Sequence, residues 1–387
     1  MVRPADYPST VTLPSPRPTD IEPVLTDLGV AVASAADGAR TLIASAEARR
    51  APPASAFAAL APDGLVLLVL AGEPGESELA ALREALWPTL HAVAFYRLRD
   101  GETLRRSHSG GARLAACAVR GTVLALRRRE HVLSPQSTRE KFDANAKGWD
   151  DDPASPSYPH FRWMRRYVAT FALPKTARRV LDFGSGAGWV GVEAATRTGA
   201  ALCAFDPSPQ MVENTRRNAH GAGVKNVDAR VGFGEAPPFA NDPPFDVVIS
   251  AGVISFSPER ERWLDGLAAM VASKGRLVIA DLNPRSHGMK HRRRTKALVP
   301  IRELNAATAD DVRTGLERRG FTTLARSDYQ LSRPIPQLMH VNETKLGGVL
   351  SRPLVWLNAA ASAGDGALSG ALEVLFDSWV LAFDRRD

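Results

Sequence analysis

A buried strand that runs into a glycine-rich turn constrains this chain more than any other feature of its sequence. The strand-like run 180–183 (VLDF) is followed by Gly184, Gly186 and Gly188 at alternate positions, and then by a helix-forming stretch. Glycine has no Cβ atom, so the backbone can turn sharply and approach a ligand closely. The first turn of the next helix carries N–H groups that can bind ligand oxygens. The sequence therefore predicts a ligand-binding turn between a strand and a helix.

An acidic residue ends the next predicted strand. The run 201–205 (ALCAF) leads into Asp206, which comes 24 residues after Asp182 (206 − 182). An acid at the end of the second strand can bind both hydroxyls of a ribose. A second frame, Gly186-x-Gly188-x-x-Gly191, also matches the dinucleotide-binding fingerprint. Its first glycine comes three residues after the strand's end, so we prefer the frame that begins at Asp182.

Strands and helices alternate over the second part of the chain, from about residue 134 to 387. This alternation predicts βαβ units, a parallel sheet with helices on both faces, and ligands at the carboxyl ends of the strands. A helix at 139–149 with a capping box from Ser137 to Glu140 opens this domain. An apolar, helical insertion is expected at about 335–375. The predicted strands are 178–184, 201–206, 227–231, 245–251, 276–282, 322–331 and 379–383, and the predicted helices between them are 189–199, 209–223, 260–275 and 309–321.

The first part of the chain predicts a smaller α/β domain at residues 23–133. Residues 1–22 are rich in Pro, Ser and Thr, a composition typical of disorder. Strand-like runs at 30–34, 65–71, 92–98 and 122–126 accompany an amphipathic helix at 76–86. We expect the last two of these strands to pair in antiparallel fashion.

The length and composition of the chain exclude several classes of protein. A length of 387 residues suits two domains. The net charge of +7 reflects a chain rich in Arg and Ala throughout, which makes a nucleic-acid partner unlikely as its explanation. Two isolated cysteines, Cys117 and Cys203, fit neither a disulfide framework nor a zinc site, so we expect no metal. No signal-peptide core is present, and the longest apolar run, 65–71, is too short to cross a bilayer. These features predict a soluble cytoplasmic protein without an integral membrane segment.

Five motifs in order resemble class I S-adenosylmethionine (SAM)-dependent methyltransferases, specifically their broad small-molecule, type 11-like group, over about residues 140–285. The resemblance implies a Rossmann-like sheet, SAM as cofactor, and in-line transfer of its methyl group to a small-molecule acceptor. The motifs are 142–150 (FDANAKGWD), similar to a helix that closes over the cofactor, 180–188 (VLDFGSGAG), 206–211 (DPSPQM), 245–250 (FDVVIS) and 275–284 (GRLVIADLNP).

The same resemblance implies roles for single residues. Asp182, Gly184 and Gly188 would position the methionyl portion, and Gly186 would allow close approach of the backbone. Asp206 would hold the ribose and Met211 would flank the adenine. Phe233 stands where the group often has an acid. We therefore expect the adenine to stack on Phe233 and to bond main-chain groups at Gly234, or Glu235. Without a ligand, Asp182 would be a helix cap and Asp206 a turn residue.

The acceptor side is less defined by the sequence. A general base is needed only if the acceptor must lose a proton. Tyr158, His160, His287 and His291 are weak candidates, because each is better explained as a packing or surface residue. The basic stretch 287–296 (HGMKHRRRTK) is expected to be a loop, either solvated or gripping a carboxylate, a phosphate or RNA. The apolar stretch 346–376 can wall a pocket for a lipophilic acceptor, or pack on the first domain or a second subunit.

Several alternatives stay open at this level. The chain can be an RNA or protein methyltransferase, a SAM-binding protein without transferase activity, or an oxidoreductase that uses the Gly186 frame. A faint repeat also links the two domains, because 56–72 (AFAALAPDGLVLLVLAG) resembles 267–283 (LAAMVASKGRLVIADLN). The first domain is then either a degenerate half of a methyltransferase without the cofactor turn, or simply another buried βα unit.

Overall fold

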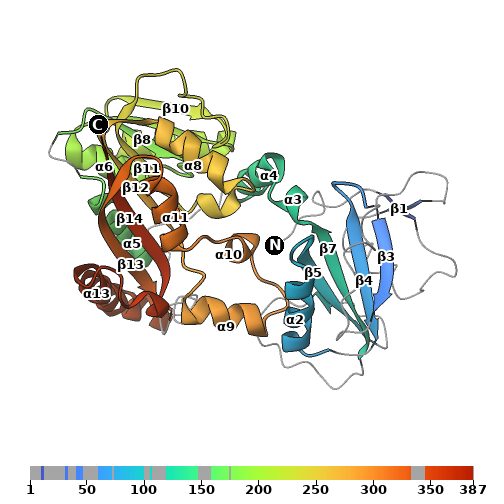
Figure 1. Cartoon of the computed structure of the whole chain (residues 1–387). Helices are drawn as coiled ribbons and strands as arrows, with labels where there is room; N and C mark the ends of the chain where they lie inside the picture. The colour runs from blue at the N-terminus through green and yellow to red at the C-terminus, as the bar shows by residue number, and fades with distance from the viewer. Residues whose placement is uncertain are drawn as a thin grey trace. The chain divides into compact units, whose positions relative to one another are not determined.

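The chain forms two compact units (Figure 1). Unit 1 contains residues 1–137 and 291–301, and unit 2 contains residues 138–290 and 302–387. Residues 291–301, which the sequence placed in the second domain, thus belong to unit 1. The computed structural model describes residues 10–12, 31–33, 41–46, 60–71, 74–99, 105–106, 119–146, 158–173, 176–332 and 345–386.

A seven-stranded sheet forms the centre of unit 2, in the order β10-β9-β8-β11-β12-β14-β13. The first five of these strands run parallel, while β14 is antiparallel to both β12 and β13. This order confirms the predicted Rossmann-like α/β sheet, and its antiparallel β14 differs from the six-strand order of dinucleotide-binding sheets. The strands are β8 (Arg179–Phe183), β9 (Ala201–Asp206), β10 (Val227–Val231), β11 (Phe245–Ala251), β12 (Val271–Leu282), β13 (Phe321–Leu331) and β14 (Phe376–Arg385).

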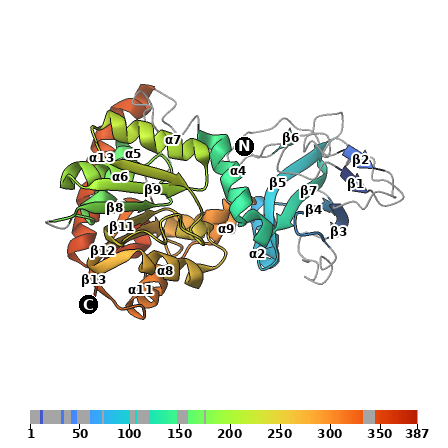
Figure 2. The ribbon, with the colours of Figure 1, turned by 90° about the horizontal axis from the view of Figure 1, so that it is seen from above.

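Helices cover both faces of this sheet, as the view in Figure 2 shows. One face carries α5 (Tyr158–Thr170), α6 (Trp189–Thr198), α7 (Pro209–Gly221) and α13 (Lys345–Ala367); the other carries α8 (Arg260–Ala269) and α11 (Ala309–Glu317). Successive side chains of a strand point to opposite faces. In β8, Val180 accordingly joins the core under α5 and α6, and Leu181 joins the core under α8.

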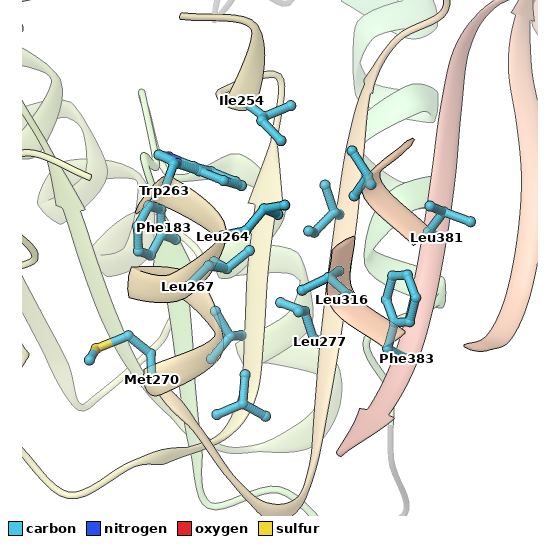
Figure 3. Packing of buried hydrophobic residues seen from close by; sticks show 14 of the residues in the cluster. Phe183, Ile254, Trp263, Leu264, Leu267, Met270, Leu277, Leu316, Leu381 and Phe383 are labelled. Carbon is cyan, nitrogen blue, oxygen red and sulfur yellow. The ribbon is translucent and has the colours of Figure 1, made fainter. Parts of the chain in front are cut away.

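The core under α8 is built around aromatic contacts (Figure 3). The Phe183 ring lies edge-on to Phe205 at 4.6 Å between centroids and to Trp263 at 5.3 Å, and all three side chains are buried. Burying one such side chain contributes about 1.5–3 kcal/mol. Since Phe183 is the residue directly before the glycine turn, this packing fixes the turn's starting point.

Two predicted boundaries in unit 2 are wrong because tertiary contacts decide them. The helix predicted at 260–275 ends at Ala269, since Val271 already pairs with Phe245 as the first residue of β12. The helix predicted at 139–149 is α4 (Pro135–Asn145). Its start is capped by the Ser134 hydroxyl, which accepts the Ser137 N–H at 3.2 Å. The predicted capping box from Ser137 to Glu140 therefore does not begin this helix.

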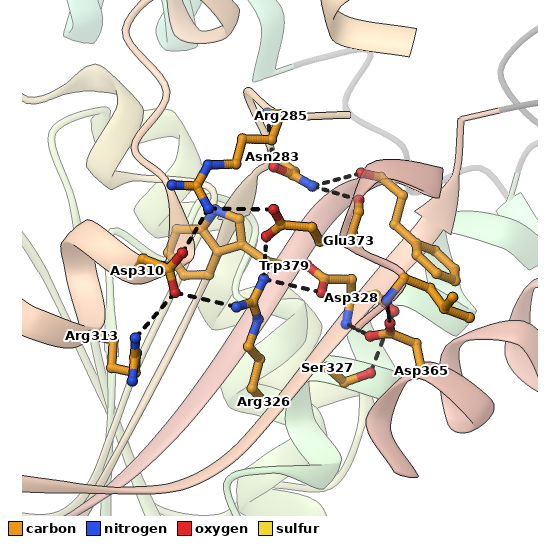
Figure 4. Close-up of polar contacts among 12 residues, drawn as sticks. Asn283, Arg285, Asp310, Arg313, Arg326, Ser327, Asp328, Asp365, Glu373 and Trp379 are labelled. Carbon is orange, nitrogen blue, oxygen red and sulfur yellow. Dashed lines mark hydrogen bonds and ion pairs between the residues drawn. The ribbon is translucent and has the colours of Figure 1, made fainter. Parts of the chain in front are cut away.

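The insertion expected at about 335–375 is helical where it is described. Helix α13 lies against β13 and α5, while residues 333–344 fall outside the described residues. Asp365 at the end of α13 accepts the main-chain N–H of Asp328 at 2.7 Å and of Leu372 at 2.9 Å (Figure 4). No helix in the described part of the chain is both long and apolar enough to cross a membrane.

Ion pairs tie the edge strand β13 to α11 and to the segments that follow β12 and precede β14, as Figure 4 shows. Arg326 on β13 bonds Glu373 at 2.5 Å and Asp310 at 3.4 Å, and Arg285 bonds the same two acids. Because these side chains are partly exposed, each pair contributes only about 0–1 kcal/mol. Their main effect is geometric, since they join α11, β13 and the segment after β12.

Unit 1 contains a five-stranded sheet of order β3-β4-β7-β5-β6. β3 is parallel to β4, and β7 is antiparallel to β4 and β5, so the predicted antiparallel pairing of the last two runs is confirmed. β3 was not predicted. The elements are β3 (Thr41–Ala46), β4 (Leu65–Ala71), α2 (Glu76–Leu86), β5 (Leu90–Arg99), β6 (Arg105–Arg106) and β7 (Val119–Arg128).

A second, two-stranded sheet joins the segment predicted to be disordered to the strand predicted at 30–34, which is confirmed as β2. β1 (Thr10–Thr12) pairs in parallel with β2 (Ala31–Ala33). For residues 10–12 the prediction of disorder is therefore wrong, because two β-branched threonines and a valine favour a strand once a partner is present. The remainder of residues 1–22 lies outside the described residues.

Four strands of unit 1 repeat the arrangement of four strands in unit 2. In the order β3-β4-β7-β5, the strands β3 and β4 run parallel to each other. The next strand, β7, comes last among the strands in the sequence of unit 1 and is antiparallel to both β4 and β5. The strands β11-β12-β14-β13 have the same order and the same directions. The faint sequence repeat thus coincides with a repeat of topology.

The basic stretch 287–296 is a helix, α9 (His287–Thr295), and not the predicted loop. Two of its residues are engaged by α2 of unit 1: Arg293 pairs with Glu84 at 2.8 Å, and Lys296 with Glu76 at 3.1 Å. The buried Arg83 side chain donates to the carbonyls of both Arg293 and Lys296. These bonds explain why residues 291–301 belong to unit 1. They also pair Arg293 and Lys296 with acids, so these two cations are less available to bind an anionic ligand.

We expect Trp263→Ala to lower the free energy of unfolding of unit 2 by about 3–5 kcal/mol, since it removes a fully buried indole from the core under α8. Trp356→Ala is the matched control: this indole is 71% exposed on α13, so its loss should change stability by no more than about 0.5 kcal/mol. Urea unfolding of both variants measures the difference. Equal effects would contradict the assignment of the core.

Candidate functional site

The three glycines of the turn after β8 all adopt positive φ, with values of 74° at Gly184, 52° at Gly186 and 80° at Gly188. A Cβ atom at Gly184 would lie 2.7 Å from a methyl carbon of Val253, and one at Gly188 would lie 2.6 Å from Thr215. At Gly186 nothing lies within 4 Å. The outer two glycines are therefore required by packing, while the middle one borders open space at the carboxyl end of the sheet.

Hydrogen bonds to strand β9 and from helix α7 hold this turn in place. The Ser185 N–H donates to the Phe205 carbonyl of β9 at 2.9 Å. On α7, the Thr215 hydroxyl donates to the Gly186 carbonyl and the Asn218 amide to the Ala187 carbonyl, both at 2.9 Å. The carbonyls of the turn thus face α7.

Asp206 lies directly against this turn, as the sequence predicts. Its carboxylate accepts the Gly186 N–H at 2.9 Å through one oxygen and the Ser208 N–H at 3.0 Å through the other. The side chain is only 6% exposed. Burial raises the pKa of Asp206 to about 6, although the two N–H donors lower it and the nearby Asp143 charge raises it further.

Helix α4 lies over the end of β9 and the loop after β11. Ser208 donates its hydroxyl proton to Asp143 at 2.6 Å, and the Asn214 amide donates to the Ala146 carbonyl at 3.1 Å. The Phe142 ring meets the Phe256 ring edge-on at 5.2 Å. This position suits a helix that closes over a ligand, as the resemblance implies, although its motif residues 149–150 lie outside the described part of the chain.

Asp182 bonds the first turn of the helix that follows the glycine turn. Its carboxylate is 2% exposed and accepts the Gly191 N–H in the first turn of α6 at 2.9 Å. A Cβ atom at Gly191 would lie 2.7 Å from that carboxylate. Burial raises the pKa of Asp182 to about 7. Asp182 therefore caps α6, which is the alternative that the sequence left open.

The residues expected around the adenine follow β10 and begin α7. Phe233 and Gly234 are partly exposed in a tight turn closed by the Ala236 N–H bond to the Phe233 carbonyl, at 3.1 Å. A Cβ atom at Gly234 would lie 2.8 Å from the Trp263 indole nitrogen. Met211 is completely buried, so its side chain packs α7 and does not line an accessible surface. A place for Met211 beside the adenine would require that side chain to move.

Among the described side chains, neither His160 nor His287 bonds the glycine turn. His160 is 4% exposed on α5, and neither ring nitrogen has a hydrogen-bond partner among the described residues. Burial lowers the pKa of His160 to about 4, so its ring is neutral. The centroid of this ring lies 5.9 Å from the centroid of the Trp163 ring. His287 is exposed at the start of α9. Tyr158 opens α5, and its side chain lies outside the described residues.

A second buried acid, which sequence reasoning missed, ends β12. Asp281 accepts the N–H and the hydroxyl of Ser255, at 3.0 and 3.1 Å, and the Leu282 N–H at 2.6 Å. The guanidinium of Arg302 lies 3.7 Å from the same carboxylate. The available signal was an acid at a strand's carboxyl end, the pattern that identified Asp206.

A family model described as a methyltransferase domain matches residues 180–275. The arsenite methyltransferase of Halobacterium salinarum is 29% identical over 154 residues, or 39% of either chain. The aklanonic acid methyltransferase of a Streptomyces species is 31% identical over 120 residues, or 30% of this chain and 54% of the relative. The chain therefore spans about half or less of these relatives' length. The solved [4+2]-cyclase SpnF covers 65% of this chain and 96% of its own, with 17% identity and a TM-score of 0.45.

The cap made by Asp182 predicts a dependence of stability on pH. Its folded-state pKa of about 7 lies above the unfolded value of about 3.9. The unfolded chain thus loses this proton first, so the stability that the group contributes is complete below about pH 4 and is lost as the pH rises through about 7.

Asp182→Asn removes this titration, while its amide oxygen can still accept the Gly191 N–H. Between about pH 5 and pH 7, we expect the unfolding free energy of unit 2 to decline by about 2–3 kcal/mol less in the variant than in the parent. Urea unfolding at several pH values measures the slopes, with Asp311→Asn on α11 as an exposed control. Parallel slopes for all three proteins would show that Asp182 is not a buried acid.

Proposed function

We propose that this chain, which carries a class I SAM-dependent methyltransferase domain, transfers the methyl group of SAM to a small-molecule acceptor. The observation that supports the proposal best is the 2.9 Å bond between the Gly186 N–H and the Asp206 carboxylate. It brings a glycine that borders open space next to an acid at the end of the neighbouring strand. An adenosyl ligand has a ribose whose two hydroxyls suit such a carboxylate.

The residues at this edge fit the cofactor in three respects. Asp206 has lone pairs left after it accepts two N–H groups, because a carboxylate offers about four acceptor positions. The open side of Gly186 leaves room for close approach of a ligand. Phe233 offers an aromatic face that is partly exposed. Asp182 supports these groups by fixing α6 behind the turn.

SAM supplies a methyl group already activated on a sulfonium. The chain's own contribution is then mainly to align the acceptor and exclude water. Helix α4 suits the second task, because Phe142 closes on Phe256 and Asp143 bonds Ser208 beside the ribose acid. His160, neutral and inside the packing of α5, is not proposed as a base. We infer that His160 does not take a proton from the acceptor's nucleophile.

The proposed acceptor is an organic small molecule and not arsenite, on which one relative acts according to its name. Trivalent arsenic, like other soft centres, prefers thiolate ligands. This chain has only two cysteines, Cys117 and Cys203, and Cys203 is buried in β9, so the sequence offers few thiolates for arsenic.

A methyltransferase acting on RNA or protein is the second candidate function. It is less favoured because Arg293 and Lys296 of the basic stretch are already paired with Glu84 and Glu76.

We also propose that unit 1 is a degenerate half of a methyltransferase and binds no cofactor. Its strands β3-β4-β7-β5 correspond to β11-β12-β14-β13, the half of the sheet that does not carry the glycine turn. Strands β8 and β9 of unit 2 have no counterpart in the five-stranded sheet of unit 1. The whole chain is therefore expected to bind one SAM molecule.

Isothermal titration tests the cofactor site directly. We expect SAM to bind with one molecule per chain, and NADH not to bind. Asp206→Ala should weaken SAM binding by about 100-fold, since two hydrogen bonds to a charged group are worth about 3 kcal/mol together. Asp228→Asn, on the exposed face of the neighbouring β10, is the matched control. Unchanged affinity in Asp206→Ala, or a second site that survives it, would refute the assignment.

Transfer of a labelled methyl group from SAM to small organic acceptors tests the activity itself. We expect product with the parent and with Asp228→Asn, and strongly reduced product with Asp206→Ala at limiting SAM. SAM binding without transfer to any acceptor would instead identify a binding protein. RNA binding that weakens steeply with salt would favour the second candidate, because phosphate contacts release counterions.

The pKa of Asp206 predicts how SAM affinity depends on pH. Ribose hydroxyls donate to the carboxylate, so only the ionised form binds well. With a pKa of about 6 before binding, affinity should be constant above that pH and about tenfold weaker for each pH unit below it. Asp206→Asn should bind more weakly and without this slope. A pH-independent dissociation constant in the parent would exclude Asp206 as the ribose ligand.

A further inference from the structure

A guanidinium group lies at the carboxyl ends of β11 and β12, beside the proposed cofactor turn. Gly252, which follows β11 with a φ of 77°, has the Arg302 side chain as its neighbour: a Cβ atom there would lie 3.5 Å from the terminal nitrogen. The next residue, Val253, packs directly against Gly184. One short loop therefore separates Arg302 from the glycine turn.

The hydrogen-bonding capacity of Arg302 is largely unused within the described residues. A guanidinium has five N–H donors. Its one recorded ion pair, with Asp281, spans 3.7 Å, which is longer than a hydrogen bond. Asp281 is already satisfied by Ser255 and Leu282. The Arg302 Nε is buried and has no hydrogen-bond partner in the described part of the chain.

The surroundings of Arg302 favour an anion over a neutral group. The guanidinium carbon lies 5.7 Å from the Phe256 ring centroid, and the Lys141 ammonium lies 5.0 Å from the same ring. Tyr329, which lies near Asp281 and Arg302, stays a neutral phenol because burial raises its pKa. Two cations, Lys141 and Arg302, thus lie near the same Phe256 ring.

We propose that Arg302 binds a carboxylate group of the methyl acceptor, so that the substrates of this enzyme are organic acids. The inference rests on the function proposed above, because it places the acceptor beside the SAM turn. Arginine presents paired N–H groups that match the two oxygens of a carboxylate, which fixes the orientation of the acceptor as well as its affinity.

A purely structural role for Arg302 makes a different prediction. If the side chain only balances Asp281, its loss leaves a buried acid unpaired and destabilises the fold. Such a loss would not change how the protein distinguishes a charged ligand from a neutral ligand of the same shape. The ratio of these two affinities is therefore the decisive measurement.

The test uses the full chain saturated with S-adenosylhomocysteine, the demethylated cofactor. Small aromatic acids, beginning with 4-hydroxybenzoate, are titrated in parallel with their amides, beginning with 4-hydroxybenzamide. In the parent, we expect the acid to bind at least tenfold more tightly than its amide. Arg302→Gln should reduce this ratio to about one, and Arg302→Lys should retain part of it, since lysine keeps the charge but not the paired geometry.

Two controls separate the possible failures. Arg262→Gln removes an exposed arginine on α8 and should leave the ratio unchanged. S-adenosylhomocysteine should bind Arg302→Gln within about twofold of the parent, which shows an intact fold. If the parent itself does not bind S-adenosylhomocysteine, the proposed function fails. If it does, but acids bind no better than amides or neither binds, or if the ratio survives in Arg302→Gln, the role of Arg302 is overturned.

Discussion

The bond between the Gly186 N–H and the Asp206 carboxylate is the interaction on which the rest of the site depends. It requires Gly186 to take a positive φ, β8 and β9 to lie side by side in register, and a carboxylate to remain in a nearly buried position. Burial opposes ionisation there, and the N–H groups of Gly186 and Ser208 favour it. The balance leaves a carboxylate that is ionised at neutral pH and still strongly attracted to further donors.

This carboxylate also connects the cofactor turn to the helix above it. Ser208 donates its N–H to Asp206 and its hydroxyl proton to Asp143 on α4, so one serine links the acid that we propose binds the ribose to α4. Asp143 raises the pKa of Asp206 through its charge. Hydroxyl donors of a ligand would stabilise the ionised form of Asp206 and so oppose this effect of Asp143.

The sequence predicts those parts of the site that local chemistry decides. Three glycines after a buried strand require a tight turn, and Asp206 follows from the alternation of strands. The direction in which Asp182 points was left open by the sequence, because it depends on the Gly191 N–H lying 2.9 Å from its carboxylate. Arg302 comes from a segment with no motif, and its place beside Gly252 arises only in three dimensions. Likewise, α9 joins unit 1 through Glu84 and Arg83, more than 200 residues earlier in the chain.

The four-strand arrangement shared by units 1 and 2 allows a comparison of equivalent positions, one with and one without a buried acid. The alignment of 56–72 with 267–283 places Leu70 of β4 at the position of Asp281 in β12. Leu70 is completely buried in an apolar core, whereas Asp281 gathers Ser255, Leu282 and Arg302 around a charge. The same strand order is thus stable with leucine at this position, and burying a carboxylate there carries a desolvation penalty. The strand order therefore does not require the Asp281 carboxylate, and this acid lies beside the Arg302 guanidinium that we propose binds the acceptor.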